Sequence, residues 1–175
     1  LKRMYKVIHA KRADGILVNH VSYDTFIATQ SFTDIYYTGE HEQYEDLVKN
    51  RVRWQGKQWG FWVTTLGPDS HSYEPMHVTY GLLHGISVWP QGWRGRNDML
   101  RKTANLWLTY DAFGYREAEW IPYYRAERFA RPDRDTVKAS LYLKRGQRAL
   151  IVIGNLTPQV TETAVALDLK AMGLS

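Results

Sequence analysis

The order of strand-like and helix-like segments changes near residue 117, and this change restricts the folds open to the chain. Short apolar, β-branched or aromatic runs typical of buried strands occupy residues 16–21, 31–40, 60–66 and 86–89. Helical spacing of apolar residues or helix-start signals occur at residues 1–12, 41–48, 74–83 and 99–110. Alternation of this kind favours parallel strands joined by right-handed helical crossovers.

Beyond that point the strand-like runs follow one another without helices between them. They occupy residues 118–124, 137–143, 149–156 and 163–169. Residues 144–147 and 155–158 have the composition of tight turns, so neighbouring strands should pair antiparallel. We therefore expect two domains, one at residues 1–117 and one at residues 118–175.

The first part is too short for a complete eight-unit barrel, which needs roughly 250 residues. The sequence predicts an α/β fold: the second half of a (β/α)8 TIM barrel, its last four units, followed by a small antiparallel β-sandwich. A complete four-stranded α/β domain is the alternative. The chain starts at Leu1 without an initiator methionine, so we expect a fragment or a processed piece. A missing N-terminal half, another chain or self-association would cover the open sheet edges.

Composition limits the function classes. With 44% hydrophobic residues in 175, the chain can form a core. It has no apolar run of the ~18 residues that cross a bilayer, and its first residues do not resemble a signal peptide. The absence of cysteine excludes disulfides and thiolate metal sites. It does not distinguish a cytoplasmic from a bacterial periplasmic or extracellular location.

The net charge of +5 raises the question of nucleic-acid binding. Apart from a basic group in residues 2–12, the arginines and lysines are scattered among acids and aromatics. This pattern favours solvated faces and arginine–aromatic stacking. We expect no nucleic-acid partner.

Residues 31–40 contain the strongest candidate site. Gly39 should end the strand, which places Glu40 at a strand's carboxyl end, where α/β folds carry their chemistry. A barrel followed by a β-sandwich is a layout common in enzymes that act on sugars. If both side chains project over the barrel mouth, Asp34 and Glu40 could supply the two carboxylates of glycosidic bond cleavage. The alternative is that Asp34 hydrogen-bonds to the backbone and Glu40 caps the next helix. Glu119 is a weaker candidate, expected to pair with Arg116, Arg125 or Arg128.

Further side chains near the expected strand ends could bind a sugar. Polar groups would hydrogen-bond to hydroxyls, and aromatic faces would stack on pyranose rings. The candidate substrate-binding residues are Asn19, His20, Tyr36, Thr65, Trp89 and Trp93. We expect Trp54, Trp59, Trp107 and Trp120 to be packing residues.

A metal site is not expected. His71, His77 and His84 are six and seven residues apart, which is not the one-turn spacing of a helical zinc pair. No motif indicates a cofactor.

A series of short motifs also carries a family resemblance. The series comprises Phe32-Thr33-Asp34 to Gly39-Glu40, Gly56 to Trp59-Gly60, Tyr80-Gly81, Leu106-Trp107, Tyr110-Asp111-Ala112-Phe113-Gly114, Ala118-Glu119-Trp120-Ile121-Pro122-Tyr123-Tyr124, and Leu167-Asp168-Leu169 to Gly173-Leu174. In this order the motifs resemble the C-terminal half of bacterial glycoside hydrolase family 123-like proteins, many of them hypothetical proteins.

The resemblance implies a TIM barrel followed by a β-sandwich, with carbohydrate as the substrate class and hydrolysis of N-acetyl-hexosaminides as the activity. In that family an adjacent Asp-Glu pair acts with the substrate's acetamido group and lies earlier in the barrel. This chain contains no Asp-Glu dipeptide. Two functions follow as expectations: a glycoside hydrolase or a fragment of one, and a noncatalytic carbohydrate-binding or scaffold protein of the same architecture.

Overall fold

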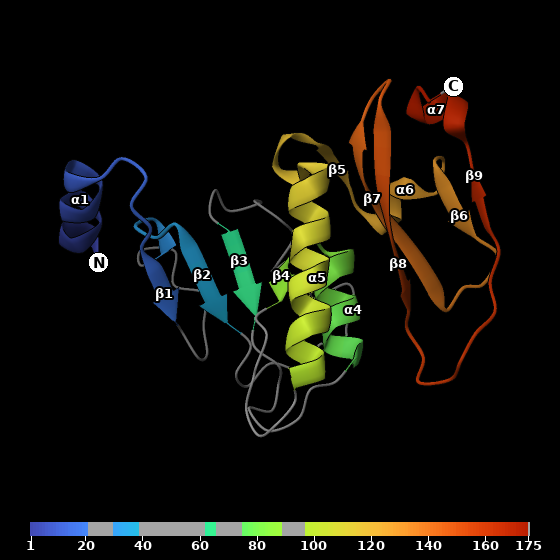
Figure 1. The fold of residues 1–175 in the computed structure, drawn as a ribbon, viewed down its shortest axis with the longest axis horizontal. Helices are drawn as coiled ribbons and strands as arrows, with labels where there is room; N and C mark the ends of the chain where they lie inside the picture. Colours follow the sequence, from blue (N-terminus) through green and yellow to red (C-terminus); the bar gives the residue numbers. More distant parts are fainter. Residues whose placement is uncertain (21–29, 39–61, 66–74, 89–96, 175) are drawn as a thin grey trace.

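The first part of the chain contains a four-stranded parallel sheet (Figure 1). The computed structural model describes residues 1–20, 30–38, 62–65, 75–88 and 97–174. The strands are β1 (Val18–His20), β2 (Ile35–Thr38), β3 (Trp62–Thr65) and β4 (Ser87–Val88). Their spatial order follows the sequence, β1-β2-β3-β4, and every neighbouring pair is parallel. The predicted parallel pairing is confirmed. In the described residues the sheet is open, and no barrel closure is present.

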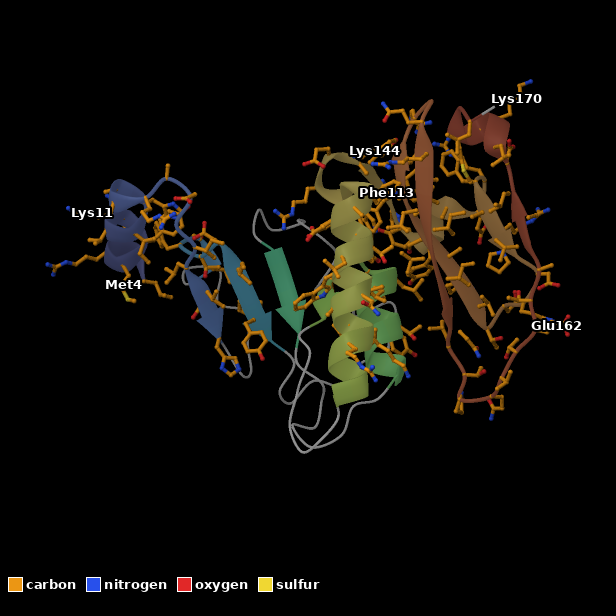
Figure 2. The ribbon with its side chains drawn as sticks, viewed as in Figure 1. Met4, Lys11, Phe113, Lys144, Glu162 and Lys170 are labelled. Carbon is orange, nitrogen blue, oxygen red and sulfur yellow. The ribbon has the colours of Figure 1, made fainter. Side chains whose placement is uncertain are left out.

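Three longer helices accompany this sheet: α1 (Lys2–Lys11), α4 (Pro75–Leu83) and α5 (Asn97–Phe113). The helix expected at residues 41–48 lies outside the described residues. Half of the apolar stripe predicted for α1 is exposed, since Met4 and Val7 are 56% and 55% exposed (Figure 2). The other two stripe residues, Tyr5 and Ile8, are half-buried. Tyr5 lies edge-on to Phe32, and His9 lies beside Asp34.

The second part contains two antiparallel sheets, as predicted. One has the order β5-β7-β8, and the other pairs β6 with β9. The strands are β5 (Glu119–Ile121), β6 (Ala130–Pro132), β7 (Val137–Lys144), β8 (Arg148–Asn155) and β9 (Val165–Leu167).

The expectation that no helices separate these strands is wrong. The four-residue helix α6 (Tyr123–Ala126) lies between β5 and β6. A 3-10 turn η1 (Tyr115–Glu117) precedes β5, and the four-residue helix α7 (Leu169–Met172) follows β9. Helices this short do not show a 3.6-residue apolar period, and only α7 is marked by caps. Asp168 accepts a hydrogen bond from the Ala171 amide at 2.8 Å, and Gly173 ends α7 with φ 71°.

Both predicted turns are present. Lys144 O accepts a hydrogen bond from Gln147 N at 3.0 Å, and Gly146 takes φ 71° in the β7–β8 hairpin. After β8, Asn155 Oδ1 accepts a hydrogen bond from Thr157 N at 3.1 Å. A side-chain amide that closes a turn in this way explains why Asn marks the site.

The sheet β5-β7-β8 is covered on both faces. One core combines β5, α6, β7 and α7 and consists of Ile121, Ala126, Phe129, Leu141, Leu143 and Met172. On the other face Tyr142 packs with Tyr110 and Phe113 of α5, flanked by Leu82 of α4. This double coverage explains why the central strand β7 is buried along nearly its whole length, including Ser140 and Tyr142.

A buried hydrogen bond joins the two parts of the chain. Ser140 Oγ of β7 donates to Leu83 O at the end of α4 over 2.7 Å. Beside it, α4 lies so close to β8 that a Cβ on Gly154 would be 2.6 Å from Thr79 Cγ2 and 2.7 Å from Leu83 Cδ1. The two parts therefore share a closely packed interface, visible as α4 and α5 beside the β7–β8 hairpin (Figure 1).

Tyr110 makes stability sensitive to alkaline pH. Burial, with a smaller contribution from Tyr115, raises the pKa of Tyr110 above its ordinary value. The folded state keeps the Tyr110 phenol protonated, whereas the unfolded chain releases this proton above its pKa of about 10. The contribution of Tyr110 to stability is therefore complete below about pH 10 and declines as the pH rises further. We expect the melting temperature of Tyr110→Phe to fall less between about pH 9 and 11 than that of the parent.

The same variant should be nearly as stable as the parent at neutral pH. The Tyr110 hydroxyl is buried and has no hydrogen-bond partner among the described residues, so phenylalanine removes no bond there. Thermal melts of both proteins across the pH series test this. Parallel loss of stability in the two proteins would contradict it.

Candidate functional site

The carboxyl ends of the parallel strands lie together at one edge of the sheet. The register places His20 of β1 beside Tyr37 of β2, and Tyr37 beside Thr64 of β3. The rings of His20 and Tyr37 are 4.8 Å apart, and His20 is exposed to solvent. Thr65 is the last residue of β3 and pairs with Thr38 of β2. The structure thus brings the predicted His20 and Thr65 positions to one edge.

Two other predicted binding residues, Asn19 and Tyr36, lie one register position further from the carboxyl ends of the strands. Asn19 is aligned with Tyr36, and neighbours in register share a face of the sheet. Tyr36 is only 1% exposed and belongs to the core. The Asn19 side-chain nitrogen is buried and has no hydrogen-bond partner within the described residues. Asn19 therefore keeps an unused donor near the strand ends, whereas Tyr36 does not reach solvent.

Asp34 lies at the opposite end of the sheet. It precedes the first residue of β2, and its Oδ2 accepts a hydrogen bond from Leu17 N at 2.8 Å. The same oxygen is 3.0 Å from His9 Nε2. These contacts tie α1 to the start of the sheet and match the structural alternative for Asp34. The expectation that Asp34 lies at the carboxyl-end rim is corrected, because the strand begins after it.

Glu40 comes two residues after the end of β2 in the sequence. At ~3.3 Å per residue, the four steps from Asp34 to Thr38 span about 13 Å. Glu40 itself lies outside the described residues, as do Trp89, Trp93, Trp54 and Trp59. Their roles stay predictions.

Glu119 forms an ion pair, but with a different partner from the arginines expected. Its Oε2 is 2.8 Å from Arg145 Nη2 and accepts a hydrogen bond from Arg145 Nε at 3.0 Å. Arg145 belongs to the β7–β8 turn, which the antiparallel pairing of β5 with β7 places beside Glu119. Sequence separation concealed this pair, because its members are 26 residues apart.

A pocket of about 430 Å³ lies beside β5 and α6. Its lining residues come from the strand, from Pro122 and from the short helix and the turn after it: Glu119, Trp120, Ile121, Pro122, Arg125 and Arg128. From the sequence, these arginines were expected to belong to the scattered surface charge or to pair with Glu119. The signal that could have found the pocket is the three-residue spacing of Arg125 and Arg128 after an aromatic and apolar run.

One wall of the pocket is fixed by the other part of the chain. The Trp120 indole lies against Gly85, where an added Cβ would be 2.9 Å from Trp120 Cε2, and Gly85 has φ 67°. Only glycine combines that backbone conformation with so close an approach. Trp120 is thus a packing residue, as expected. The same prediction is wrong for Trp107, which is 41% exposed.

The described residues contain no group of three or more side chains arranged to hold a metal ion. Within this set, His84 is 1% exposed and its Nδ1 lies 2.7 Å from Tyr80 O. No described helix is long and apolar enough to cross a membrane. The predicted arginine–aromatic stacking is present, with the Arg128 guanidinium 4.4 Å from the Phe129 ring centre.

These features define a chain in which a parallel α/β sheet packs against an antiparallel β domain. Residues 102–175 match the family model of the glycoside hydrolase 123 C-terminal domain. This part of the chain is therefore similar to that domain, in agreement with the resemblance that the motif series carries. No curated protein and no solved structure matches the chain.

Proposed function

We propose that this chain is the C-terminal part of a glycoside hydrolase that cleaves N-acetyl-hexosaminides. The observation that carries the proposal is the glycoside hydrolase 123 C-terminal domain directly following a parallel α/β segment. The sequential strand order β1-β2-β3-β4 is the order of consecutive units in a (β/α)8 barrel. In this proposal the four strands are the last four of such a barrel, and further polypeptide pairs with the edges of β1 and β4.

The sugar is proposed to bind at the carboxyl ends of the strands, where His20 and Thr65 lie. His20, stacked on Tyr37, offers a ring nitrogen to a sugar hydroxyl. The unused Asn19 donor supports this end of the sheet as a polar site. Trp89 and Trp93, which follow β4 in the sequence, would supply stacking faces.

Glu40 is the proposed general acid, which gives its proton to the leaving glycosidic oxygen. Its position two residues after β2 supports this role. The contacts of Asp34 with Leu17 N and His9 support a positioning role at the start of the sheet instead. A carboxylate outside this chain or the substrate's own acetamido group would meet the developing positive charge.

Two matched carboxylate variants test the proposal on p-nitrophenyl N-acetyl-β-hexosaminides and other aryl glycosides. We expect Glu40→Gln to lose about 10²–10⁴-fold in kcat, since a general acid contributes about that much. Asp34→Asn should keep most of the activity, because an amide oxygen still accepts from Leu17 N. Circular dichroism checks that both variants fold.

The outcomes separate the roles. Loss of activity in Asp34→Asn with Glu40→Gln active would reverse the assignment of the two carboxylates. An inactive parent that binds N-acetyl-hexosamine would favour the noncatalytic carbohydrate-binding alternative. The engagement of Asp34 within the fold is the observation that favours this alternative, because it leaves the described residues without a free carboxylate pair at the strand ends.

A further inference from the structure

The β5–α6 pocket carries an excess of positive charge. Its single carboxylate, Glu119, is bound by Arg145 through two contacts of 2.8 and 3.0 Å. Arg125 and Arg128 line the same pocket, and neither forms an ion pair with any described residue. Since Arg145 offsets Glu119, the two remaining guanidinium groups leave the pocket with an uncompensated charge of about +2.

The arginines are held in place by aromatic rings. The Arg128 guanidinium carbon is 4.4 Å from the Phe129 ring centre, and that of Arg145 is 5.9 Å from the same ring. Arg125 lies 6.0 Å from the Tyr124 ring centre. Stacking of this kind restricts a guanidinium and reduces the entropy lost when it binds an anion.

The rest of the lining comes from apolar residues, Trp120, Ile121 and Pro122. Trp120 and Ile121 face opposite sides of β5, so the indole, which lies against Gly85, supplies the aromatic surface of the pocket. At about 430 Å³ the pocket falls within the roughly 300–1,000 Å³ range of small-molecule sites. An aromatic surface opposite paired guanidinium groups fits a ring that carries an anionic substituent.

We propose that this pocket binds an acidic sugar, a pyranose that bears a carboxylate or a sulfate ester. The guanidinium forks of Arg125 and Arg128 bind the anionic group, and the Trp120 indole takes the ring. The choice of a sugar rests on the proposed function. The choice of an anion rests on the charge of the pocket. The site lies in the glycoside hydrolase 123 C-terminal domain and is separate from the carboxyl ends of the parallel strands.

Isothermal titration calorimetry on the 175-residue chain tests the proposal. The probes are N-acetylglucosamine 6-sulfate and glucuronic acid, with neutral N-acetylglucosamine and sodium sulfate as comparisons. We expect the acidic sugars to bind about tenfold or more tightly than either comparison, because the charged group and the ring both contribute. Their affinity should fall with added salt, since the arginines are exposed.

The matched variants are the double change Arg125→Gln/Arg128→Gln and the control Arg131→Gln, an exposed arginine of β6 outside the pocket. The double variant should lose about tenfold or more in affinity for the acidic sugars, and the control should bind like the parent. These arginines are exposed, so the variants should fold, and circular dichroism confirms this.

Three results would overturn the proposal: equal binding of the neutral and acidic sugars, sulfate binding as tight as the sulfated sugar, or unchanged affinity in the double variant. Because binding is measured without hydrolysis, its failure differs from failure of the proposed function. If the chain is inactive but binds acidic sugars, the proposed function fails and this binding site stands. If the chain is active but does not bind acidic sugars, the proposed function stands and this binding site is wrong.

Discussion

Replacing Phe129 with alanine is expected to lower the free energy of unfolding by about 3–5 kcal/mol. The side chain is 1% exposed and lies in the core formed with Ile121, Leu141 and Met172. Alanine would leave a cavity among the core side chains of β5, β7 and α7. Urea titration followed by circular dichroism measures the loss.

A second substitution keeps this test informative if the alanine variant does not fold. Phe129→Leu retains most of the apolar volume and should lose less stability than Phe129→Ala. Val160→Ala is the control, because Val160 is fully exposed and should change stability by no more than about 0.5 kcal/mol. If Phe129→Ala cost less than about 1 kcal/mol, the core described around it would be wrong.

The second large effect is expected at the interface between the two parts of the chain. Gly154→Ala adds a single methyl group in a strand, at a position where Cβ would be 2.6 Å from Thr79 and 2.7 Å from Leu83. Overpacking of this kind costs about 1–3 kcal/mol. The variant should therefore unfold at lower urea concentration than the parent.

A double-mutant cycle identifies the cause. Leu83→Ala alone should be destabilising, because Leu83 is fully buried. In the Gly154→Ala background its cost should be smaller by about 0.5–3 kcal/mol, since it removes one of the clashing side chains. Strict additivity of the two changes would show that α4 does not press on β8 at this point.

The regular elements were readable from sequence because their signals are local. The alternation before residue 117 predicted the parallel sheet, and the turn at residues 144–147 predicted the β7–β8 hairpin. The four-residue helices α6 and α7 were missed, since a single turn is too short to show an apolar period.

The site was less predictable, because it depends on contacts distant in sequence. The motif at residues 31–40 includes all of β2, and Asp34 precedes the strand instead of following it. The pairing of Glu119 with Arg145 depends on the register of β5 against β7. Neither could be read from spacing alone, and both decide which charged groups are available to a ligand.

The buried Ser140–Leu83 hydrogen bond crosses the boundary at which the family match begins. The family model begins at residue 102, inside α5, and omits α4. Yet α4 packs against Gly154, and its Leu83 O accepts the hydrogen bond from Ser140 Oγ. A fragment that begins at residue 102 would expose the surface of β8 that α4 covers. It would also leave the Ser140 hydroxyl of β7 without its acceptor, Leu83 O. We therefore expect a fragment of residues 75–175 to be more stable than one of residues 102–175.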